Sequence, residues 1–202
     1  MKKMFLALLA VVAMVACEDK STPQTPPNEP ETEVATKYNL TFNSEGECYS
    51  QSFEGISEDV FTAEIKNYGW KQIDLHEIFD NGNIEVANFW EGRDGGGSYN
   101  FYINETVLTQ YTSSSAYPPG EDKGYCNYDY AFEDSAIRIK DNTILMFRLL
   151  ELDDDTMVCI EYIGTNALFT KNIYGLGTYK RMTPEELEKV QQTYTRNWDE
   201  AE

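Results

Sequence analysis

From Trp70 onward the sequence is a succession of short segments in which apolar and polar residues alternate, and turn-forming residues separate them. Apolar side chains at every second position are typical of antiparallel strands with one buried face. The breaks carry Asn, Asp, Gly and Pro, which favour tight turns. The candidate strands are Trp70–Ile78, Ile84–Trp90, Ser98–Ile103, Thr106–Tyr111, Tyr125–Phe132, Ile144–Leu150, Thr156–Ile163 and Thr178–Met182, with Ala136–Ile139 and Ala167–Thr170 ambiguous. This spacing predicts an all-β fold, an antiparallel up-and-down β-barrel of about eight strands.

A short helix is predicted before the first barrel strand. Ser57 is placed to cap it, and Ile56 and Phe61 are spaced as a hydrophobic staple. One apolar face is expected along the helix, made by Phe61, Ile65 and Tyr68, and Gly69 is expected to end it. Two further short strands are predicted upstream of this helix, Tyr38–Phe42 and Cys48–Phe53.

A second helix is predicted at about residues 183–198. It begins with Thr183-Pro-Glu-Glu186, which has the residues of a capping box with proline at the first helical position. Apolar residues then recur every three or four positions at Leu187, Val190, Tyr194 and Trp198. That stripe predicts a helix packed against the outside of the sheet.

The N-terminal residues have the composition of an export signal. Lys2 and Lys3 precede an apolar run that ends at Ala16, and Cys17 follows. A basic start, an apolar run of about a dozen residues and a small residue before the cut are the parts of a signal peptide. We therefore expect a signal peptide over residues 1–16, a disordered tether rich in Pro, Thr and Glu over residues 17–36, and one folded domain over residues 37–202.

The charge of the chain bears on its partners. The formal net charge is −19, from 35 acidic and 16 basic residues. A strongly acidic surface repels phosphate backbones, and nucleic-acid binding depends on Lys and Arg that neutralise phosphates. We expect no nucleic-acid partner.

Several short motifs resemble those of a known family. Met14-Val-Ala-Cys17 resembles the lipobox of bacterial lipoproteins, in which the cysteine is lipidated. The layout from Ile56-Ser-Glu-Asp-Val-Phe61 through Gly69-Trp70 to a first hairpin at Asn81-Gly82, with Tyr179-Lys-Arg-Met-Thr183 at the close, resembles the lipocalin-like lipoproteins of Gram-negative bacteria. The resemblance covers the chain from about Ile56 to its end. The lipobox resemblance implies a lipoprotein signal peptide over residues 1–16, lipid (palmitate) on Cys17 at the head of a lipidated tether, and a cell-envelope location, with the outer membrane favoured. The lipocalin-like resemblance implies an up-and-down barrel and small apolar ligands. Asp134-Ser-Ala136 and Asp155-Thr-Met157 also resemble an O-glycosylation signal of such bacteria.

Aromatic residues supply the candidate binding positions. The alternation directs one set inward: Trp70, Tyr99, Phe101, Tyr128, Tyr130 and Phe132. An eight-stranded barrel has room only for side chains or one small ligand, so this set either fills the barrel or lines a pocket. Buried tyrosine hydroxyls need polar partners, which a ligand or water can supply. Trp70, Tyr99, Phe101, Tyr128 and Tyr130 are therefore the candidate contacts for a small apolar or aromatic-stacking ligand.

Other chemistries have less support in the sequence. The single histidine, His76, rules out a zinc site with two or three histidines, and we expect it to face solvent or a polar neighbour in its strand. Asp153-Asp-Asp155 lacks the spaced ligands of an EF-hand loop and is interpreted as a hairpin turn. No catalytic residue, metal or cofactor is assigned. A pair of carboxylates acting on a glycosidic bond stays open as an alternative.

Three cysteines lie beyond Cys17. In the expected register Cys126 points inward with Tyr128, and Cys159 points away from the face that carries Val158 and Ile160. No Cys126–Cys159 disulfide is therefore expected.

Three functions remain open at this point. The leading hypothesis is a membrane-anchored, non-enzymatic lipoprotein that binds a small ligand or a protein partner. The alternatives are a carboxylate-based hydrolase acting on carbohydrate and a structural accessory subunit of an envelope complex. A deep tyrosine-lined cavity would favour the first, two facing carboxylates the second, and a filled barrel with an exposed apolar patch the third.

Overall fold

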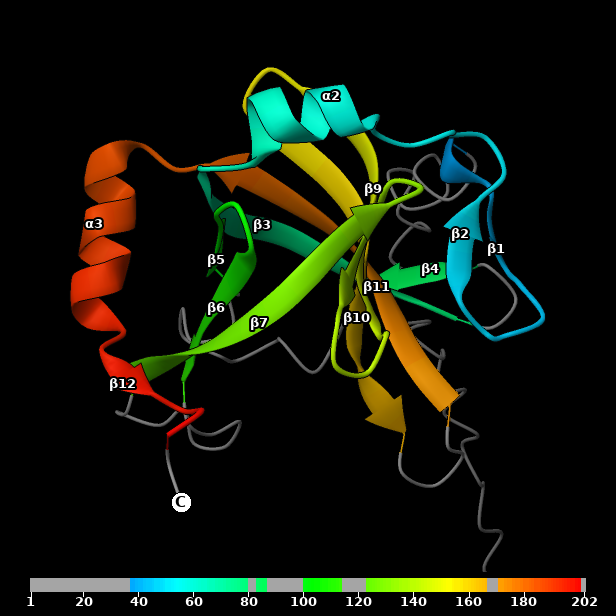
Figure 1. Cartoon of the computed structure of the whole chain (residues 1–202). Coiled ribbons are helices and arrows are strands. Elements are labelled where there is room, and N and C mark those ends of the chain that lie inside the picture. Colours follow the sequence, from blue (N-terminus) through cyan, green and yellow to red (C-terminus); the bar gives the residue numbers. More distant parts are fainter. Residues whose placement is uncertain (1–36, 80–82, 87–99, 114–122, 167–170, 201–202) are drawn as a thin grey trace, which may run out of the picture.

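A computed structural model describes residues 37–79, 83–86, 100–113, 123–166 and 171–200. Eight antiparallel strands form a closed barrel (Figure 1). In spatial order they are β3 (Gly69–Ile78), β5 (Asn100–Ile103), β6 (Val107–Ser113), β7 (Lys123–Glu133), β8 (Ala136–Ile139), β9 (Leu145–Asp153), β10 (Thr156–Asn166) and β11 (Lys171–Arg181). The barrel closes because β11 pairs with β3 as well as with β10. The predicted up-and-down barrel is confirmed.

The strand boundaries differ from the prediction mainly in β11. This strand starts at Lys171 rather than at Thr178, so it begins seven residues earlier than predicted. The ambiguous segment Ala136–Ile139 is strand β8, whereas residues 167–170 lie outside the described part. Strand β4 (Ile84–Val86) extends the pairing along the far half of β3.

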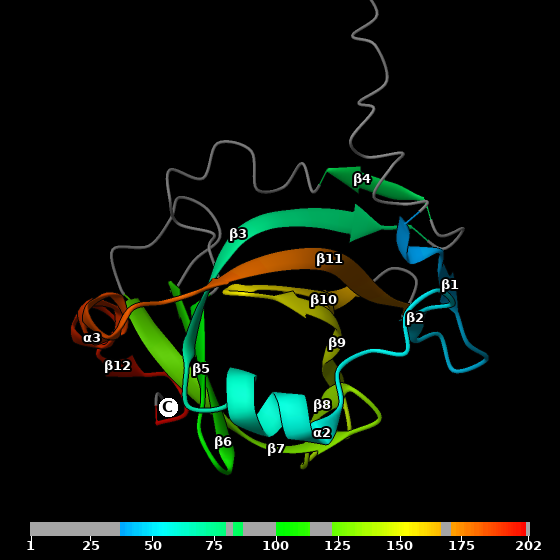
Figure 2. The ribbon, with the colours of Figure 1, turned by 90° about the horizontal axis from the view of Figure 1, so that it is seen from above.

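A short helical segment covers one end of the barrel (Figure 2). It consists of α2 (Glu58–Val60), capped by Ser57 as predicted, and one π-helical turn (Phe61–Ile65). The staple pair Ile56 and Phe61 and the turn residue Ile65 are buried in the interior core. The sequence prediction placed the helix end too late. The helix ends at Ile65, Asn67 adopts a positive φ of 65°, and Gly69 already belongs to β3, so Tyr68 does not join the buried face and is 36% exposed.

The N-terminal strands form a hairpin outside the barrel. Strands β1 (Leu40–Phe42) and β2 (Cys48–Ser50) pair with each other. They cover the outer face of β9, β10 and β11, where a second apolar core forms with Leu150, Ile160 and Leu176 among its members. These barrel strands are consequently buried on both faces, inside by the interior core and outside by the hairpin.

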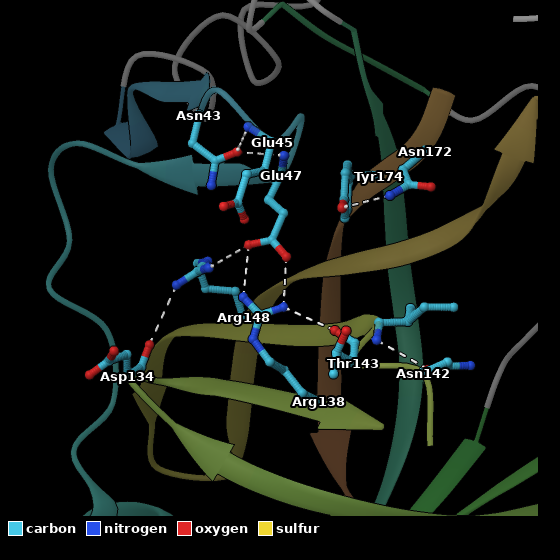
Figure 3. Close-up of polar contacts among 11 residues, drawn as sticks. Asn43, Glu45, Glu47, Asp134, Arg138, Asn142, Thr143, Arg148, Asn172 and Tyr174 are labelled. Carbon is cyan, nitrogen blue, oxygen red and sulfur yellow. Dashed lines mark hydrogen bonds and ion pairs between the residues drawn. The ribbon is translucent and has the colours of Figure 1, made fainter. Parts of the chain in front are cut away.

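A charged clamp holds this hairpin to the barrel (Figure 3). Both carboxylate oxygens of Glu47 accept from the guanidinium of Arg138 on β8, at 2.6 and 2.8 Å. The guanidinium of Arg148 on β9 lies 3.6 Å from Glu47 Oε2, and it also donates a hydrogen bond to the Asp134 carbonyl. The Arg138 guanidinium lowers the pKa of Glu47, so the ion pair persists in mildly acidic solution.

The C-terminal helix lies on the opposite outer side, as predicted (Figure 2). Helix α3 (Pro184–Thr193) carries the predicted capping box between Thr183 and Glu186. Leu187 lies so close to Gly69 of β3 that a Cβ there would come within 2.8 Å of it. The helix is shorter than the predicted 183–198, because the chain leaves it to form β12 (Arg196–Asn197), which pairs in parallel with β7.

The residues after α3 still pack as the apolar stripe indicated. The Tyr194 ring lies 5.9 Å from that of Tyr111 on β6. The backbone N–H of Trp198 donates to the Tyr125 carbonyl of β7 at 2.9 Å. All the contacting side chains of α3 are only half-buried, so the helix is docked at the surface.

Candidate functional site

The barrel interior is divided into a filled half and a hollow half. Beneath α2 it is packed with side chains such as Phe61, Trp70 and Phe101. Beyond them lies a cavity of about 430 Å³. A volume in this range is typical of sites for small organic molecules. The barrel is therefore neither fully filled nor fully empty.

The cavity lining combines aromatic, aliphatic and polar side chains. Three tyrosines contribute, Tyr128, Tyr162 and Tyr179, together with Phe147. The aliphatic part consists of Ile139, Ile144, Met146 and Ile163. The remaining lining residues are Gln110, Thr112, Asn142 and Glu161. In a ligand pocket, apolar side chains of this kind contact the body of the ligand, and the polar groups orient it.

Glu161 is the distinctive residue of the cavity. It belongs to β10, and it is only 4% exposed. Gln72 of β3 donates to Glu161 Oε1 at 2.8 Å, and the Tyr179 hydroxyl of β11 donates to Oε2. The Gln72 side chain also donates to the Tyr179 oxygen at 3.1 Å. Three neighbouring strands thus hold one carboxyl group at the cavity wall.

Glycine in β11 makes room for this carboxyl. A Cβ built on Gly177 would lie 2.8 Å from Glu161 Oε2 and 2.9 Å from the Tyr179 ring. Any side chain at position 177 would therefore displace the Glu161–Tyr179 pair. Glycine inside a strand often marks such a close approach.

Burial controls the protonation of Glu161. Loss of solvent raises its pKa to about 7, although the hydrogen bonds from Tyr179 and Gln72 oppose this change. A pKa in this range makes both protonation states accessible near neutral pH. It can accept hydrogen bonds as a carboxylate or donate one as an acid.

The sequence-predicted aromatic positions lie in both halves of the barrel. Tyr128 lines the cavity. Trp70, Phe101 and Tyr130 belong to the filled core, against which the partly buried Phe132 packs. Tyr99 lies outside the described residues. The two alternatives for this aromatic set, filling the barrel or lining a pocket, therefore each apply to one end of the barrel.

The face of β10 that points inward differs from the expected one. Val158 and Ile160 face the outer core beneath the hairpin, whereas Met157 and Cys159 face the interior. Alternation could not reveal this, because both faces of the strand are buried. Cys159 consequently lies in the interior core, whereas Cys126 on β7 is half-buried, and Cys48, Cys126 and Cys159 are all free thiols. Burial raises the pKa of the Cys159 thiol well above its usual value.

The remaining residues that the sequence singled out, His76, the Asp153–Asp155 run and Ser135, lie in hairpins or make local polar contacts. His76 Nε2 lies 2.8 Å from Asp74 of the same strand. Asp153, Asp154 and Asp155 stand at the β9–β10 hairpin, where Asp154 adopts a positive φ. The hydroxyl of Ser135 donates to the Ile56 carbonyl at 2.9 Å. Among the described residues no group of three or more His, Cys, Asp or Glu is placed to hold a metal ion.

Neither a protein-family model nor a curated protein sequence matches this chain. Within the described ranges, no helix has the length and apolar character needed to cross a membrane.

Proposed function

We propose that this chain is a lipid-anchored, extracytoplasmic lipoprotein whose barrel binds a small organic ligand in the cavity beside Glu161. The observation that carries the binding role is the hollow half of the barrel, about 430 Å³ in volume and lined by three tyrosines. Side chains of the same kinds pack the other half into the interior core, which contains Trp70 and Phe101. The hollow is thus a local property of one end and not a sign of loose packing throughout.

The same lining bears on the competing functions. A glycosidase of the usual kind needs two carboxyl groups, about 5–10 Å apart. Glu161 is the sole acidic residue among the described residues that line the cavity. A structural subunit would need an apolar docking surface, and the exposed large apolar side chains among the described residues are Val60, Tyr68, Ile73 and Phe79. The cavity supports ligand binding better than either alternative.

Blocking the cavity is expected to abolish binding of a neutral probe. Thr112 on β6 lines the cavity, so Thr112→Trp places a large ring inside it. We expect the wild-type protein to bind the neutral dye N-phenyl-1-naphthylamine saturably, and the variant to bind it at least about tenfold more weakly. Fluorescence titration measures both affinities.

The chain offers a matched control for this substitution. Thr109 lies on the same strand, and its hydroxyl donates to Asn127 at an exposed position. Thr109→Trp makes the same chemical change outside the barrel and should leave dye affinity near the wild-type value. A wild-type protein without saturable dye binding, or equal losses in the two variants, contradicts a binding cavity.

The anchor is proposed from the sequence. A diacylglycerol on Cys17 would supply two acyl chains, and two chains are what stable membrane attachment requires. Cys17→Ser is expected to move the protein from the membrane fraction to the soluble fraction, or to leave its leader uncut. Cys126→Ser is the control, because this half-buried thiol lies in strand β7. Wild-type partitioning of Cys17→Ser, measured by fractionation and intact mass, would refute lipidation at this residue.

A further inference from the structure

The geometry points to a ligand class for this cavity, and the inference rests on the binding function proposed above. We propose that the cavity selects small amines with a flat apolar body, with the ammonium group held at Glu161 and the body against the aromatic lining. The cavity would correspondingly discriminate against fatty acids, phosphate esters and other anions of similar size.

The charges of the lining favour a cationic ligand over an anionic one. The lining contains one carboxyl group, and none of its described residues is a Lys, Arg or His. An anionic ligand would lose its hydration on entering without gaining an ion pair, which is costly. The net charge of −19 adds a field that concentrates cations around the protein and repels anions.

The hydrogen bonds to Glu161 orient its carboxyl group and leave it able to accept a further donor. Gln72 and Tyr179 each donate to one of its oxygens. A carboxylate offers about four acceptor positions, so both oxygens retain capacity for a further donor. Gln72 and Tyr179 also fix the orientation of the carboxyl group before any ligand arrives, which lowers the entropic cost of binding. A hydrogen bond from an ammonium group to this carboxylate would be charge-assisted, and such bonds are about twice as strong as neutral ones.

The apolar side chains of the lining favour a ligand with a flat ring. Tyr128 of β7 and Phe147 of β9 present aromatic rings to the cavity, and Met146 adds an adaptable thioether. These side chains suit a planar ring better than a long flexible chain, because ring contacts fix orientation at little conformational cost. A single carboxyl group beside aromatic and aliphatic side chains therefore matches an arylalkylamine in size and polarity.

Three indoles of the same shape but different charge test the inference. Tryptamine ends in an ammonium group, tryptophol in a hydroxyl and indole-3-propionate in a carboxylate. Their affinities are measured by isothermal titration calorimetry at pH 8. This pH lies above the pKa of Glu161, so the carboxylate form of the side chain prevails. We expect wild-type protein to bind tryptamine about tenfold or more tightly than tryptophol, and indole-3-propionate most weakly of the three.

Glu161→Gln removes the charge and keeps the shape of the side chain. In this variant the tryptamine-to-tryptophol affinity ratio should fall to about one. Because the ratio compares two ligands on one protein, partial unfolding cannot imitate the result. Glu133→Gln is the matched control, since Glu133 is an exposed carboxylate on β7, and it should keep the wild-type ratio.

The outcomes separate this inference from the proposed function. If the neutral dye binds but wild type prefers tryptophol or binds neither indole, the cavity binds ligands and the amine class is wrong. A preference for tryptamine that survives in Glu161→Gln also overturns the role of this carboxyl. If the dye fails to bind as well, both proposals fall.

Discussion

Replacing Trp70 by alanine is expected to lower the free energy of unfolding by about 4 kcal/mol, within the range for deleting a large buried aromatic side chain. Trp70 is 0% exposed and lies in the filled half of the barrel. Its indole N–H donates to the Ile65 carbonyl at 3.2 Å, which ties β3, the first strand of the barrel, to the helical segment that covers the barrel end. The guanidinium of Arg181 on the last strand lies 5.5 Å from its ring. The substitution removes all three contributions at once.

Urea denaturation of the wild type and the variant measures this loss. Trp198→Ala is the matched control, because Trp198 is only half-buried and packs against Gly124 of β7, apart from the core that contains Trp70. We expect Trp198→Ala to cost less than half as much. Trp70→Phe should also cost less than Trp70→Ala, since it keeps an aromatic ring and loses the hydrogen bond to Ile65. Equal losses at positions 70 and 198 would contradict a core organised around Trp70.

The second large effect is a pH-dependent stabilisation by Glu161→Gln. The ordinary pKa of a glutamate is 4.5, and burial raises that of Glu161 to about 7 in the folded protein. Between these values the unfolded chain releases the proton while the folded protein keeps it. The contribution of Glu161 to stability is therefore fully favourable below pH 4.5 and is lost as the pH rises towards 7. The loss amounts to about 3 kcal/mol.

Comparison of the variant with wild type isolates this effect from other titrating groups. Relative to wild type, Glu161→Gln should gain about 3 kcal/mol of stability between pH 4.5 and pH 8, because glutamine has no proton to lose. Glu47 works in the opposite direction, since its pKa is lowered by Arg138, but it is present in both proteins. Denaturation curves at several pH values provide the measurement. A difference between the two proteins that does not change with pH would show that Glu161 is not buried as a neutral acid.

Most of the fold follows from local patterns in the sequence. Alternation located the barrel strands because each has at least one face in a core, and the capping residues Ser57 and Thr183 marked both helix starts. The pattern failed where another part of the chain changed the environment. Residues 171–177 were not predicted as a strand, and Gly175 and Gly177 in this segment lie where the side chains of Leu75 and Glu161 approach the backbone. Only the tertiary contact explains them.

The site was harder to predict than the fold. Of the aromatic candidates that the structure describes, Tyr128 alone lines the cavity, because α2 and its π-helical turn fill the end where Trp70 and Phe101 lie. Glu161 escaped notice because the outer hairpin buries Val158 and Ile160, which made the outer face of β10 look like the inner one. A usable signal was present. Glu161 shares a period of two with Met157 and Cys159, and an acid in such a series is unusual unless it has partners.

Closure of the barrel by β11 also governs how the chain reaches this structure. Most strand pairs join neighbours along the sequence and can form early as hairpins, whereas the contact of Gln72 with Tyr179 joins residues 107 positions apart. Pairings this distant in sequence raise the contact order and slow folding. The Gln72–Glu161–Tyr179 cluster needs β3, β10 and β11 together, so it assembles only at the step that closes the ring. The proposed binding site therefore requires the closed ring, and a chain that ends before β11 lacks both the closed barrel and this candidate site.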